Sequence, residues 1–459
     1  MAENYDALII GTGQAGPPLA ARLAAEGWKV AIIERDRFGG TCVNEGCTPT
    51  KALVASARAA RVARRAADYG VEISGSIAVN MADVKARKDR IVQRSTSNVE
   101  KWLRALANCT VYQGHARFDG PSTVEVGDSR LQADKIFVNV GTRPSVPSMP
   151  GLDAVDYLTS SRMMDVDFVP EHLVVIGGSY IGLEFGQMYR RFGSQVTIVQ
   201  RGPRLIPRDD EDVSEAVGEI LTNEGIDIRV NAECTAAERH GDGVRVRLDC
   251  DAGAPTVDGS HLLLAVGRRP NTDDLGLETT GVEVTERGTI VVDEQLRTAE
   301  PGIWALGDCN GRGAFTHTSY NDYEIVAANL LDGDTRRVRD RFLCYGLFID
   351  PPLARVGMTE TEVRRSGRPA LVAKRPMTRV SRAIEKGETQ GFMKIAVDAE
   401  TEQILGAAIL GIGGDESIHC IIDVMYAKAP FTVIKRAVHI HPTVSELIPT
   451  LLGDLEPLQ

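Results

Sequence analysis

The stretch DALIIGTGQAGPPLAARLAAEG, residues 6–27, decides the fold. Its apolar run over 7–10 predicts a buried parallel strand, because strands that are covered on both faces are continuously apolar. In the second half of the stretch, alanine and leucine recur at helical spacing. Between the strand and the helix stands the pattern G-x-G-x-x-G, formed by Gly11, Gly13 and Gly16.

A strand, a glycine turn and a helix in this order predict a dinucleotide-binding unit. Gly11 allows the tight turn, Gly13 lets the backbone approach a pyrophosphate, and Gly16 lets the helix pack closely. The pyrophosphate would lie at the N-terminus of the helix. A second strand is expected over 30–33 and ends in Glu34, whose carboxylate would accept a hydrogen bond from a ribose hydroxyl.

The same pattern returns farther along the chain. Apolar strands are expected over 173–176 and 196–199. The turn after the first of them carries Gly177, Ser179 and Gly182. Serine stands in the place of the middle glycine, and its side chain is small enough for a nucleotide still to approach the backbone of the turn closely. Two such units predict that the protein binds two dinucleotides.

The end of the second unit indicates which nicotinamide is used. Gln200 stands where the first unit has an acid, and Arg201 follows it, with Arg204 and Arg208 nearby. Loss of the carboxylate and gain of guanidinium charge favour a 2′-phosphate, and therefore NADPH. Arginines that are simply solvated at the surface are the alternative, so NADH stays open.

A pair of cysteines lies in the segment GGTCVNEGCTPTKA, residues 39–52. A structural zinc site would need two further Cys or His ligands at comparable spacing, and an inert disulfide is unusual in a reducing compartment. Cys42 and Cys47 therefore predict a redox couple. Thr48 and Pro49 indicate a helix start, with Thr48 as the cap and Pro49 at the first position. A thiolate on Cys47 would then lie beside a helix N-terminus, which lowers its pKa.

Composition limits the remaining possibilities. The chain has 459 residues, 43% of them hydrophobic and 25% charged, which is typical of a globular protein of about three domains. A net charge of -11 argues against a nucleic-acid surface. The sequence has no apolar run of the length that a membrane helix needs, and its N-terminus lacks the basic region of a signal peptide. We therefore expect a cytoplasmic protein without nucleic-acid or membrane partners.

Three further segments complete a resemblance to a known family. An apolar strand over 136–144 is interrupted by Gly-Thr, another over 303–308 ends in Asp308, and His-Pro-Thr stands at 441–443. With both nucleotide turns and the cysteine pair, the chain resembles the class I pyridine nucleotide-disulfide oxidoreductases. These include dihydrolipoamide dehydrogenase, glutathione reductase and mercuric reductase. The resemblance covers the chain from Asp6 to about Leu447.

The resemblance implies an α/β fold with two Rossmann-like domains, one for FAD and one for NAD(P), and a C-terminal α+β dimerisation domain. The expected boundaries are 1–147 for the first part of the FAD domain, 148–268 for the NAD(P) domain, 269–336 for the return to the FAD domain, and 337–459 for the dimer-interface domain. The segment 147–151 reads as a linker, and the last domain is expected to end in a helical tail.

The resemblance also implies roles for single residues. Cys42 and Cys47 would form a disulfide over the flavin, with Cys42 exchanging with substrate and Cys47 facing the flavin. Lys51 would lie near the flavin and pair with Glu184, and Tyr180 would gate the nicotinamide pocket. The remaining residues assigned to cofactors are Thr41, Thr142 and Asp308 for FAD, and Gly267 with the second turn and Arg201 for NAD(P).

The catalytic base is expected near the C-terminus. His441 would take and return the proton of the exchanging thiol, and Glu446 would orient its imidazole. In the family this histidine reaches the disulfide of the other subunit, so the resemblance implies a homodimer. Thr443-x-x-Glu446 also matches a capping box, which leaves a purely structural role open for Glu446.

The expected reaction passes electrons from NAD(P)H through FAD and the cysteine pair to a small disulfide or a related oxidised substrate. Without a C-terminal cysteine pair, reduction of mercury is disfavoured, and Gln200 counts against lipoamide. The alternatives are dihydrolipoamide dehydrogenase in the NAD-reducing direction, and a diaphorase or metal- or oxidant-reducing flavoenzyme of the mercuric-reductase-like branch. His317, in the segment FTHTSY, would touch flavin or substrate, or belong to the core. No metal site is expected.

Overall fold

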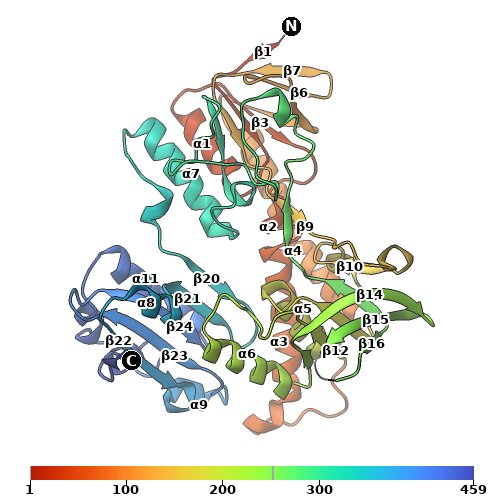
Figure 1. Ribbon diagram of the computed structural model, residues 1–459, viewed down its shortest axis with the longest axis vertical. Helices are drawn as coiled ribbons and strands as arrows, with labels where there is room; N and C mark the ends of the chain where they lie inside the picture. The colour runs from red at the N-terminus through yellow and green to blue at the C-terminus, as the bar shows by residue number, and fades with distance from the viewer. Residues whose placement is uncertain (1, 251–252, 459) are drawn as a thin grey trace.

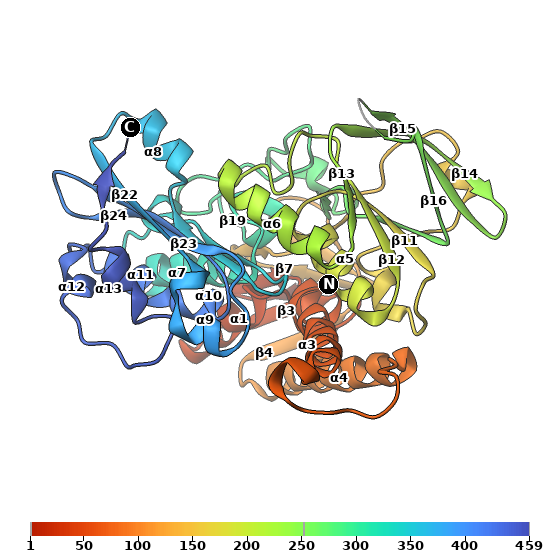
Figure 2. The same cartoon turned by 90° about the horizontal axis from the view of Figure 1, so that it is seen from below.

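The structure is a computed structural model that describes residues 2–250 and 253–458. It has a first nucleotide-binding unit at one end, with a second unit and a C-terminal sheet side by side at the other (Figure 1). Viewed from below, the C-terminal sheet and the second unit flank the first (Figure 2). No helix of the described part is long and apolar enough to cross a membrane.

The first unit contains a parallel sheet with strand order β19-β8-β2-β3-β4. The strands of this sheet are β2 (Ala7–Ile10), β3 (Val30–Glu34), β4 (Cys109–Gln113), β8 (Ile136–Val138) and β19 (Ile303–Ala305). The helices around it are α1 (Gly16–Ala25), α2 (Gly40–Asn44), α3 (Cys47–Arg64), α4 (Met81–Ala105) and α7 (Thr316–Leu331). The late strand β19 pairs with β8, so a late segment of the chain returns to this sheet.

A smaller sheet lies beside the first one, in the order β1-β7-β6-β5. It is built from β1 (Glu3–Asn4), β5 (Ala116–Phe118), β6 (Thr123–Val126) and β7 (Ser129–Gln132).

The second unit has a parallel sheet in the order β10-β17-β11-β12-β13 and an antiparallel sheet in the order β14-β15-β16. Their strands are β10 (Tyr157–Thr159), β11 (His172–Ile176), β12 (Gln195–Val199), β13 (Asp227–Arg229), β14 (Ala232–His240), β15 (Gly243–Cys250), β16 (Thr256–Gly259) and β17 (His261–Leu264). The helices are α5 (Tyr180–Phe192) and α6 (Glu211–Asn223). All of these elements lie inside the expected range 148–268.

The chain passes between the two units twice, and the two passages pair with each other. The outgoing segment is β9 (Thr142–Pro144) and the returning one is β18 (Arg268–Pro270), which together form an antiparallel ribbon. The expected continuous strand over 136–144 is therefore two strands, because Gly141, with φ +64°, turns the chain between them. This ribbon brings Thr142 and Arg268 to the same place.

The C-terminal part is an antiparallel sheet in the order β20-β21-β24-β23-β22-β25 with short helices packed on it. Its strands are β20 (Cys344–Leu347), β21 (Leu353–Gly357), β22 (Ala370–Pro376), β23 (Phe392–Asp398), β24 (Ile404–Leu410) and β25 (Glu456–Pro457). The helices are α8 (Glu360–Ser366), α9 (Ser381–Glu385), α10 (Gly414–Ser417), α11 (His419–Tyr426), α12 (Thr432–Lys435) and α13 (Leu447–Leu451). The tail is helical as expected, except that β25 pairs with β22 and returns the end of the chain to the sheet.

Candidate active site

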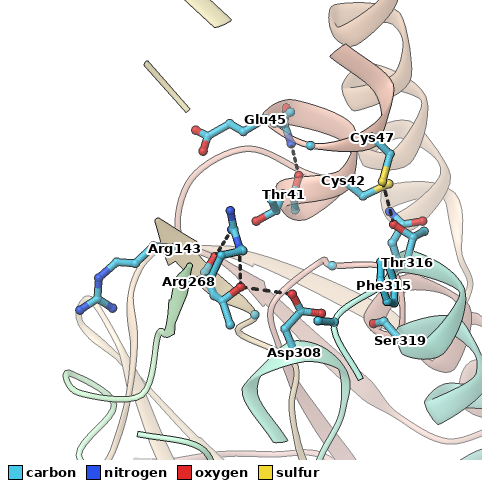
Figure 3. Close-up of a pocket in the computed structure, with 18 of the residues that line it drawn as sticks. Thr41, Cys42, Glu45, Cys47, Arg143, Arg268, Asp308, Phe315, Thr316 and Ser319 are labelled. Carbon is cyan, nitrogen blue, oxygen red and sulfur yellow. Dashed lines mark hydrogen bonds between the residues drawn. The ribbon is translucent and has the colours of Figure 1, made fainter. Parts of the chain in front are cut away.

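A single cavity of about 790 Å³ joins the elements that carry the expected catalytic residues. A cavity of this size is typical of a ligand site. Its wall contains the first glycine turn, the cysteine pair, Lys51 and Glu184, Thr142 and Asp308, and Tyr180. Figure 3 shows Cys42 and Cys47 on one side of this space, with Asp308 and Arg268 across from them.

The first turn is closed so tightly that its glycines are required. Gly11 has φ +104°, and a Cβ there would lie 2.4 Å from the carbonyl oxygen of Asn139. A Cβ on Gly16 would lie 2.3 Å from the Gly11 oxygen. No side chain caps α1; the Gly16 N–H donates to the Gly13 oxygen at 3.0 Å and the next two residues are prolines without an N–H, so what this end of the helix offers a ligand is the close approach of the backbone and the helix dipole. This geometry fits a pyrophosphate at the helix N-terminus.

Glu34 ends β3 at the wall of the same cavity. Its Oε2 accepts a hydrogen bond from the Thr12 backbone N–H at 3.0 Å and another from the Thr12 hydroxyl. Its Oε1 accepts from the Asp36 N–H at 2.9 Å. The carboxylate is thereby held beside the turn, where the expected ribose contact would lie.

The second turn repeats the first in detail. Gly177 has φ +117°, and a Cβ on Gly182 would lie 2.0 Å from the Gly177 oxygen. Ser179 directly precedes α5, and its hydroxyl makes no capping hydrogen bond. The Gln200 Oε1 accepts from the Gly178 N–H at 3.0 Å, just as Glu34 accepts from Thr12. Gln200 thus occupies the place of the acid without its charge.

Of the other residues expected at the nicotinamide, Arg201 points into solvent. Its side chain is 80% exposed and lies 3.8 Å from Glu233. Gly267, with φ +115°, stands just before β18 and has open space around it. Tyr180 is the first residue of α5 and is the member of this group that lines the cavity.

The cysteine pair spans the junction of two helices. Cys42 lies in α2, and Cys47 is the first residue of α3. The expected cap is wrong: the helix begins one residue before Thr48, Gly46 precedes it, and no side chain caps it. A Cβ on Gly46 would lie 2.9 Å from the Thr41 oxygen and 3.2 Å from the Cys42 Cα. Glycine here allows the backbone of one cysteine to approach that of the other, and the Thr41 carbonyl closes α2 through the Glu45 N–H at 2.9 Å (Figure 3).

Both thiols are free, and both line the same cavity. The pKa of Cys47 is lowered to about 6, chiefly by hydrogen bonding from Cys42, while burial opposes the shift and Thr316 and the charge of Lys51 contribute to it. The Thr316 hydroxyl is 3.1 Å from the Cys47 sulfur. Donation to Cys47, together with burial, raises the pKa of Cys42. At neutral pH the geometry therefore favours a thiolate on Cys47 and a protonated Cys42.

The expected ion pair behind the cysteines is present. The Lys51 Nζ lies 2.9 Å from the Glu184 Oε2 and 3.0 Å from its Oε1. Glu184 is buried and also accepts from the Phe348 N–H at 2.9 Å. The lysine ammonium lies 4.5 Å from the centre of the Phe348 ring. A buried carboxylate that is paired in this way holds Lys51 in one position at the cavity wall.

Across the cavity, Asp308 forms a small polar cluster that the sequence only partly predicted. The expected strand stops at Ala305, and Asp308 lies in a following turn of 3₁₀ helix. The Thr142 hydroxyl donates to the Asp308 Oδ2 at 3.2 Å, and Arg268 Nε donates to the Thr142 Oγ1 at 2.8 Å (Figure 3). Burial raises the pKa of Asp308 and lowers that of Arg268. These buried polar groups face the cavity, and they fit the hydroxyl-rich chain of a flavin cofactor.

Arg268 was missed as a site residue because its segment, Gly267 to Asn271, marked only the end of a domain. The pairing of β9 with β18 places it, and that pairing joins residues far apart in the sequence. His317 is exposed and so does not belong to the core, and its contact with flavin or substrate stays a prediction. Its Nε2 donates to the Cys344 carbonyl at 2.7 Å, its ring stacks on Phe315 at 5.5 Å, and it also lines the cavity.

His441 and Glu446 lie outside the cavity of their own chain. The His441 Nδ1 is 2.8 Å from the Glu446 Oε2, and the imidazole is 74% exposed. Helix α13 begins only after Glu446, so this residue is not at the third helical position that a capping box requires. The Glu446 N–H does donate to the Thr443 hydroxyl at 3.2 Å, but its carboxylate holds the histidine.

Together these features define a redox enzyme that binds two dinucleotides and carries a dithiol next to one of them. The model of the family "Pyridine nucleotide-disulphide oxidoreductase" matches residues 5–322, and that of its dimerisation domain matches residues 344–452. The chain therefore belongs to the pyridine nucleotide-disulphide oxidoreductase family. It is an NAD(P)H-dependent flavoprotein oxidoreductase that uses FAD, and its dimerisation domain makes it a homodimer.

Curated relatives align along nearly the whole chain. The probable pyridine nucleotide-disulfide oxidoreductase RclA of Escherichia coli (strain K12) is 36% identical over 458 residues, which cover 98% of this chain and 99% of that protein. A mercuric reductase of Streptomyces lividans is 34% identical over 97% of this chain and 95% of its own. A dihydrolipoyl dehydrogenase of Geobacillus stearothermophilus is 33% identical over 96% and 94%.

Solved structures agree with this assignment. The HOCl-induced flavoprotein disulfide reductase RclA from Escherichia coli, solved as a Cu(II) complex, superposes with a TM-score of 0.90 at 35% sequence identity. The match covers 98% of this chain and 99% of the other. The expected α/β fold with a C-terminal dimerisation domain is therefore confirmed.

Proposed function

We propose that the protein is an NADPH-dependent reductase of a small disulfide, or of a related oxidised substrate, that acts through Cys42 and Cys47. The observation that carries this proposal is the pair of free thiols in the wall of the cavity, with the Thr316 hydroxyl 3.1 Å from the Cys47 sulfur. When bound, FAD accepts hydride from the nicotinamide and supplies two electrons to the cysteine pair. Residues of the two glycine turns, with Glu34, Thr142 and Asp308, would hold the two cofactors.

The chain's own residues perform the exchange with substrate. Cys42 attacks one sulfur of the substrate disulfide, a mixed disulfide forms, and the first thiol leaves. Cys47 then attacks the Cys42 sulfur, which closes the Cys42–Cys47 bond and releases the second thiol. Two electrons and two protons pass to the substrate. The same dependence on thiols and nicotinamide favours the cytoplasm as the place of action.

This exchange needs a base, because Cys42 is the protonated member of the pair. We propose that His441 of the partner subunit takes the Cys42 proton and returns it to the leaving thiol. Its exposed imidazole, oriented by Glu446 at 2.8 Å, supports this role. The domain boundaries at 147, 268 and 336 remain part of the same proposal, and the β9–β18 ribbon at two of them supports it.

NADPH is favoured over NADH for two reasons at the second turn. Gln200 is fixed by the Gly178 N–H at 3.0 Å and has no charge to repel a 2′-phosphate. Arg201 is 80% exposed and makes only a long, exposed contact with Glu233 at 3.8 Å, which its guanidinium can exchange for that phosphate. The specificity constants for NADPH and NADH, compared in the wild type and in Arg201→Gln, test this. Selective loss with NADPH is expected, and equal constants in the wild type would contradict the choice.

A second candidate substrate is a thiol-binding metal ion such as Cu(II). One observation favours it: the relative that superposes with a TM-score of 0.90 was solved as a Cu(II) complex. The reduced pair would give one electron to each of two Cu(II) ions, yielding two Cu(I) and the Cys42–Cys47 disulfide. Thiolates are ligands for copper, so the reduced pair can bind the ion before it gives up its electrons.

Anaerobic stopped-flow reduction with NADPH and with NADH decides between these candidates. We expect a long-wavelength absorption band from the Cys47 thiolate beside the flavin. The reduced enzyme is then mixed separately with oxidised glutathione, lipoamide, other small disulfides and Cu(II). Discharge of the band by one disulfide supports the first proposal, and discharge by Cu(II) alone supports the second. Absence of the band in flavin-replete protein would contradict both.

A further inference from the structure

Asp209 lies at the centre of a buried cluster that the mechanism above does not use. Its side chain is 1% exposed and lies in the connection between β12 and α6. The carboxylate Oδ1 accepts from the Tyr345 hydroxyl at 3.1 Å and from Arg355 Nη1 at 3.3 Å. Its Oδ2 accepts from the Tyr180 hydroxyl at 3.3 Å. One carboxylate thus joins the cavity residue Tyr180 to two strands of the C-terminal sheet.

The rings around this carboxylate continue to the cysteine side of the cavity. Tyr180 packs edge-to-face on Tyr345 at 5.4 Å and on Phe315 at 6.2 Å. Phe315 stacks on Tyr345 at 5.4 Å and directly precedes Thr316, the hydroxyl neighbour of Cys47. The position of the Tyr180 ring is therefore set by two aromatic contacts and one hydrogen bond. Of these three, only the hydrogen bond can be removed without changing a ring.

The connection that carries Asp209 is itself fixed at several points. Ile206, buried and with φ +36°, donates its N–H to the Gly178 oxygen of the second turn at 2.9 Å. A β-branched residue rarely adopts a positive φ, and such backbone persists only where its surroundings impose it. Asp210 accepts from the Thr361 N–H at 3.0 Å, and Asp212 binds Lys394 at 2.8 Å. Asp209 is therefore presented to Tyr180 from a rigid base.

From this geometry we infer that Asp209 is a positioning residue. Its carboxylate holds the hydroxyl of Tyr180 like a latch, and this hydrogen bond sets the affinity of the oxidised, FAD-loaded enzyme for NAD(P)H. The inference rests on the proposed function, in which the Tyr180 ring must move aside for the nicotinamide. Opening the ring then breaks the Tyr180–Asp209 hydrogen bond. Only the open form binds NAD(P)H, so the apparent Kd equals the Kd of the open form divided by the fraction of molecules that are open. The latch lowers that fraction and therefore raises the apparent Kd.

The experiment is a double-mutant cycle on the FAD-loaded enzyme. Tyr180→Phe and Asp209→Asn, singly and together, are mixed anaerobically with NADPH, and the bleaching of the flavin is followed at increasing nicotinamide concentration. Tyr180→Phe is expected to lower the apparent Kd about three- to tenfold, the worth of one hydrogen bond, and Asp209→Asn, whose uncharged amide is a weaker partner for the hydroxyl, should lower it by a smaller factor. The double variant is expected to match Tyr180→Phe. Glu211→Gln, which changes an exposed carboxylate at the start of α6 and leaves the anchors of this connection in place, is the control and should behave as wild type.

The reaction of the reduced enzyme with a disulfide distinguishes loss of the latch from a general structural defect. Oxidation of the pre-reduced enzyme by a disulfide should keep its wild-type rate in Asp209→Asn, whereas misfolding would slow both halves. Should Asp209→Asn fail to fold with Arg355 left unpaired, Asp209→Asn combined with Arg355→Gln removes both charges and should show the same fall in Kd.

Two outcomes overturn the latch while the proposed function survives. One is a wild-type Kd in Asp209→Asn alongside a lowered Kd in Tyr180→Phe, and the other is effects that multiply in the double variant. An unchanged apparent Kd in Tyr180→Phe would instead show that the Tyr180 hydroxyl does not control access of the nicotinamide, which also overturns the latch. Failure of both nicotinamides to bleach the flavin of the wild type would overturn the proposed function itself.

Discussion

At the scale of single residues, the two cysteines differ because of their partners. Cys47 receives a hydrogen bond from Cys42, lies 3.1 Å from the Thr316 hydroxyl and feels the charge of Lys51, all of which favour its thiolate. Cys42 is the donor, so the same hydrogen bond keeps it protonated. Cys47 is therefore already a thiolate, whereas Cys42 must lose a proton before it can act as a nucleophile.

The first prediction concerns this hydrogen bond. With a pKa of about 6, Cys47 should be a thiolate at pH 7 and become protonated as the pH falls below about 6. Cys42→Ser keeps a donor and should keep a low midpoint. Cys42→Ala removes the largest cause of the shift, so the midpoint should rise toward the ordinary thiol value of about 8.5.

The measurement is a pH titration of the thiolate's ultraviolet absorbance in each variant, with Cys47→Ser as the blank. Identical midpoints in the serine and alanine variants would show that the hydrogen bond does not control the pKa.

At the scale of elements, the junction of α2 and α3 sets the distance between the thiols. Cys42 is near the middle of one short helix and Cys47 begins the next, so the turn between them must be compact. Gly46 makes this possible, since any Cβ there would lie 2.9 Å from the Thr41 oxygen. A single methyl group at this position pushes the two helices apart.

The second prediction is therefore that Gly46→Ala slows exchange with disulfide at least about tenfold, because small misplacements of reacting groups are costly. The pKa of Cys47 should rise in the same variant, since its main donor moves away. Gly218→Ala, in α6 with open space around it, is the matched control and should be neutral or slightly stabilising. The rate of exchange is measured by stopped flow on the pre-reduced enzyme. A wild-type rate in Gly46→Ala would show that the junction tolerates the methyl group.

At the scale of the whole molecule, α3 is held by both of the neighbouring parts of the chain. Arg61 pairs with Glu224 at 2.7 Å, and Arg58 pairs with Asp350. Both carboxylates also bind Arg191, at 2.7 and 2.6 Å, and its side chain is 4% exposed. The charges in this buried network alternate, so each carboxylate is shared between two arginines. The helix that begins with Cys47 is thereby fixed at its far end.

The third prediction tests this network. Arg191→Met should lower the free energy of unfolding by about 3 kcal/mol, because it removes the most deeply buried arginine of the network and leaves Glu224 and Asp350 with one partly exposed partner each. Arg117→Met removes an exposed pair with Glu278 and should cost about 0–1 kcal/mol. Urea unfolding followed by circular dichroism measures both. Equal losses in the two variants would mean that the buried network adds no more than a surface pair.

The fourth prediction tests whether the active site is shared between subunits. Cys42→Ser and His441→Gln should each be inactive as homodimers. After mixed refolding or co-expression, a heterodimer contains one site with both Cys42 and His441 intact, provided that they come from different subunits. Random pairing should restore about one quarter of wild-type activity.

His439→Gln serves as the control for the histidine, because it lies two residues away and should remain active. Mixtures of the two inactive variants that stay inactive, while forming heterodimers, would place Cys42 and His441 of one site in the same subunit.

The sequence by itself determined which local units the chain forms. Strand, glycine turn and helix lie within about 20 contiguous residues in each unit, and their residue types admit few other conformations. The same holds for the cysteine pair, whose spacing and composition indicated redox chemistry. The prediction from the sequence was wrong at the start of α3, because backbone contacts with α2, and not Thr48, determine where that helix begins.

Tertiary structure decided which of these units meet. Arg268 reaches Thr142 because two distant passages pair as a ribbon, and Asp209 reaches Tyr180 because the β12–α6 connection is anchored on the C-terminal sheet. Of the side chains that tune Cys47, Cys42 and Lys51 are its neighbours in the sequence, whereas Thr316 is brought to it from α7. Contacts of this kind depend on how sheets dock, and docking is governed by packing of whole surfaces, which local spacing does not record.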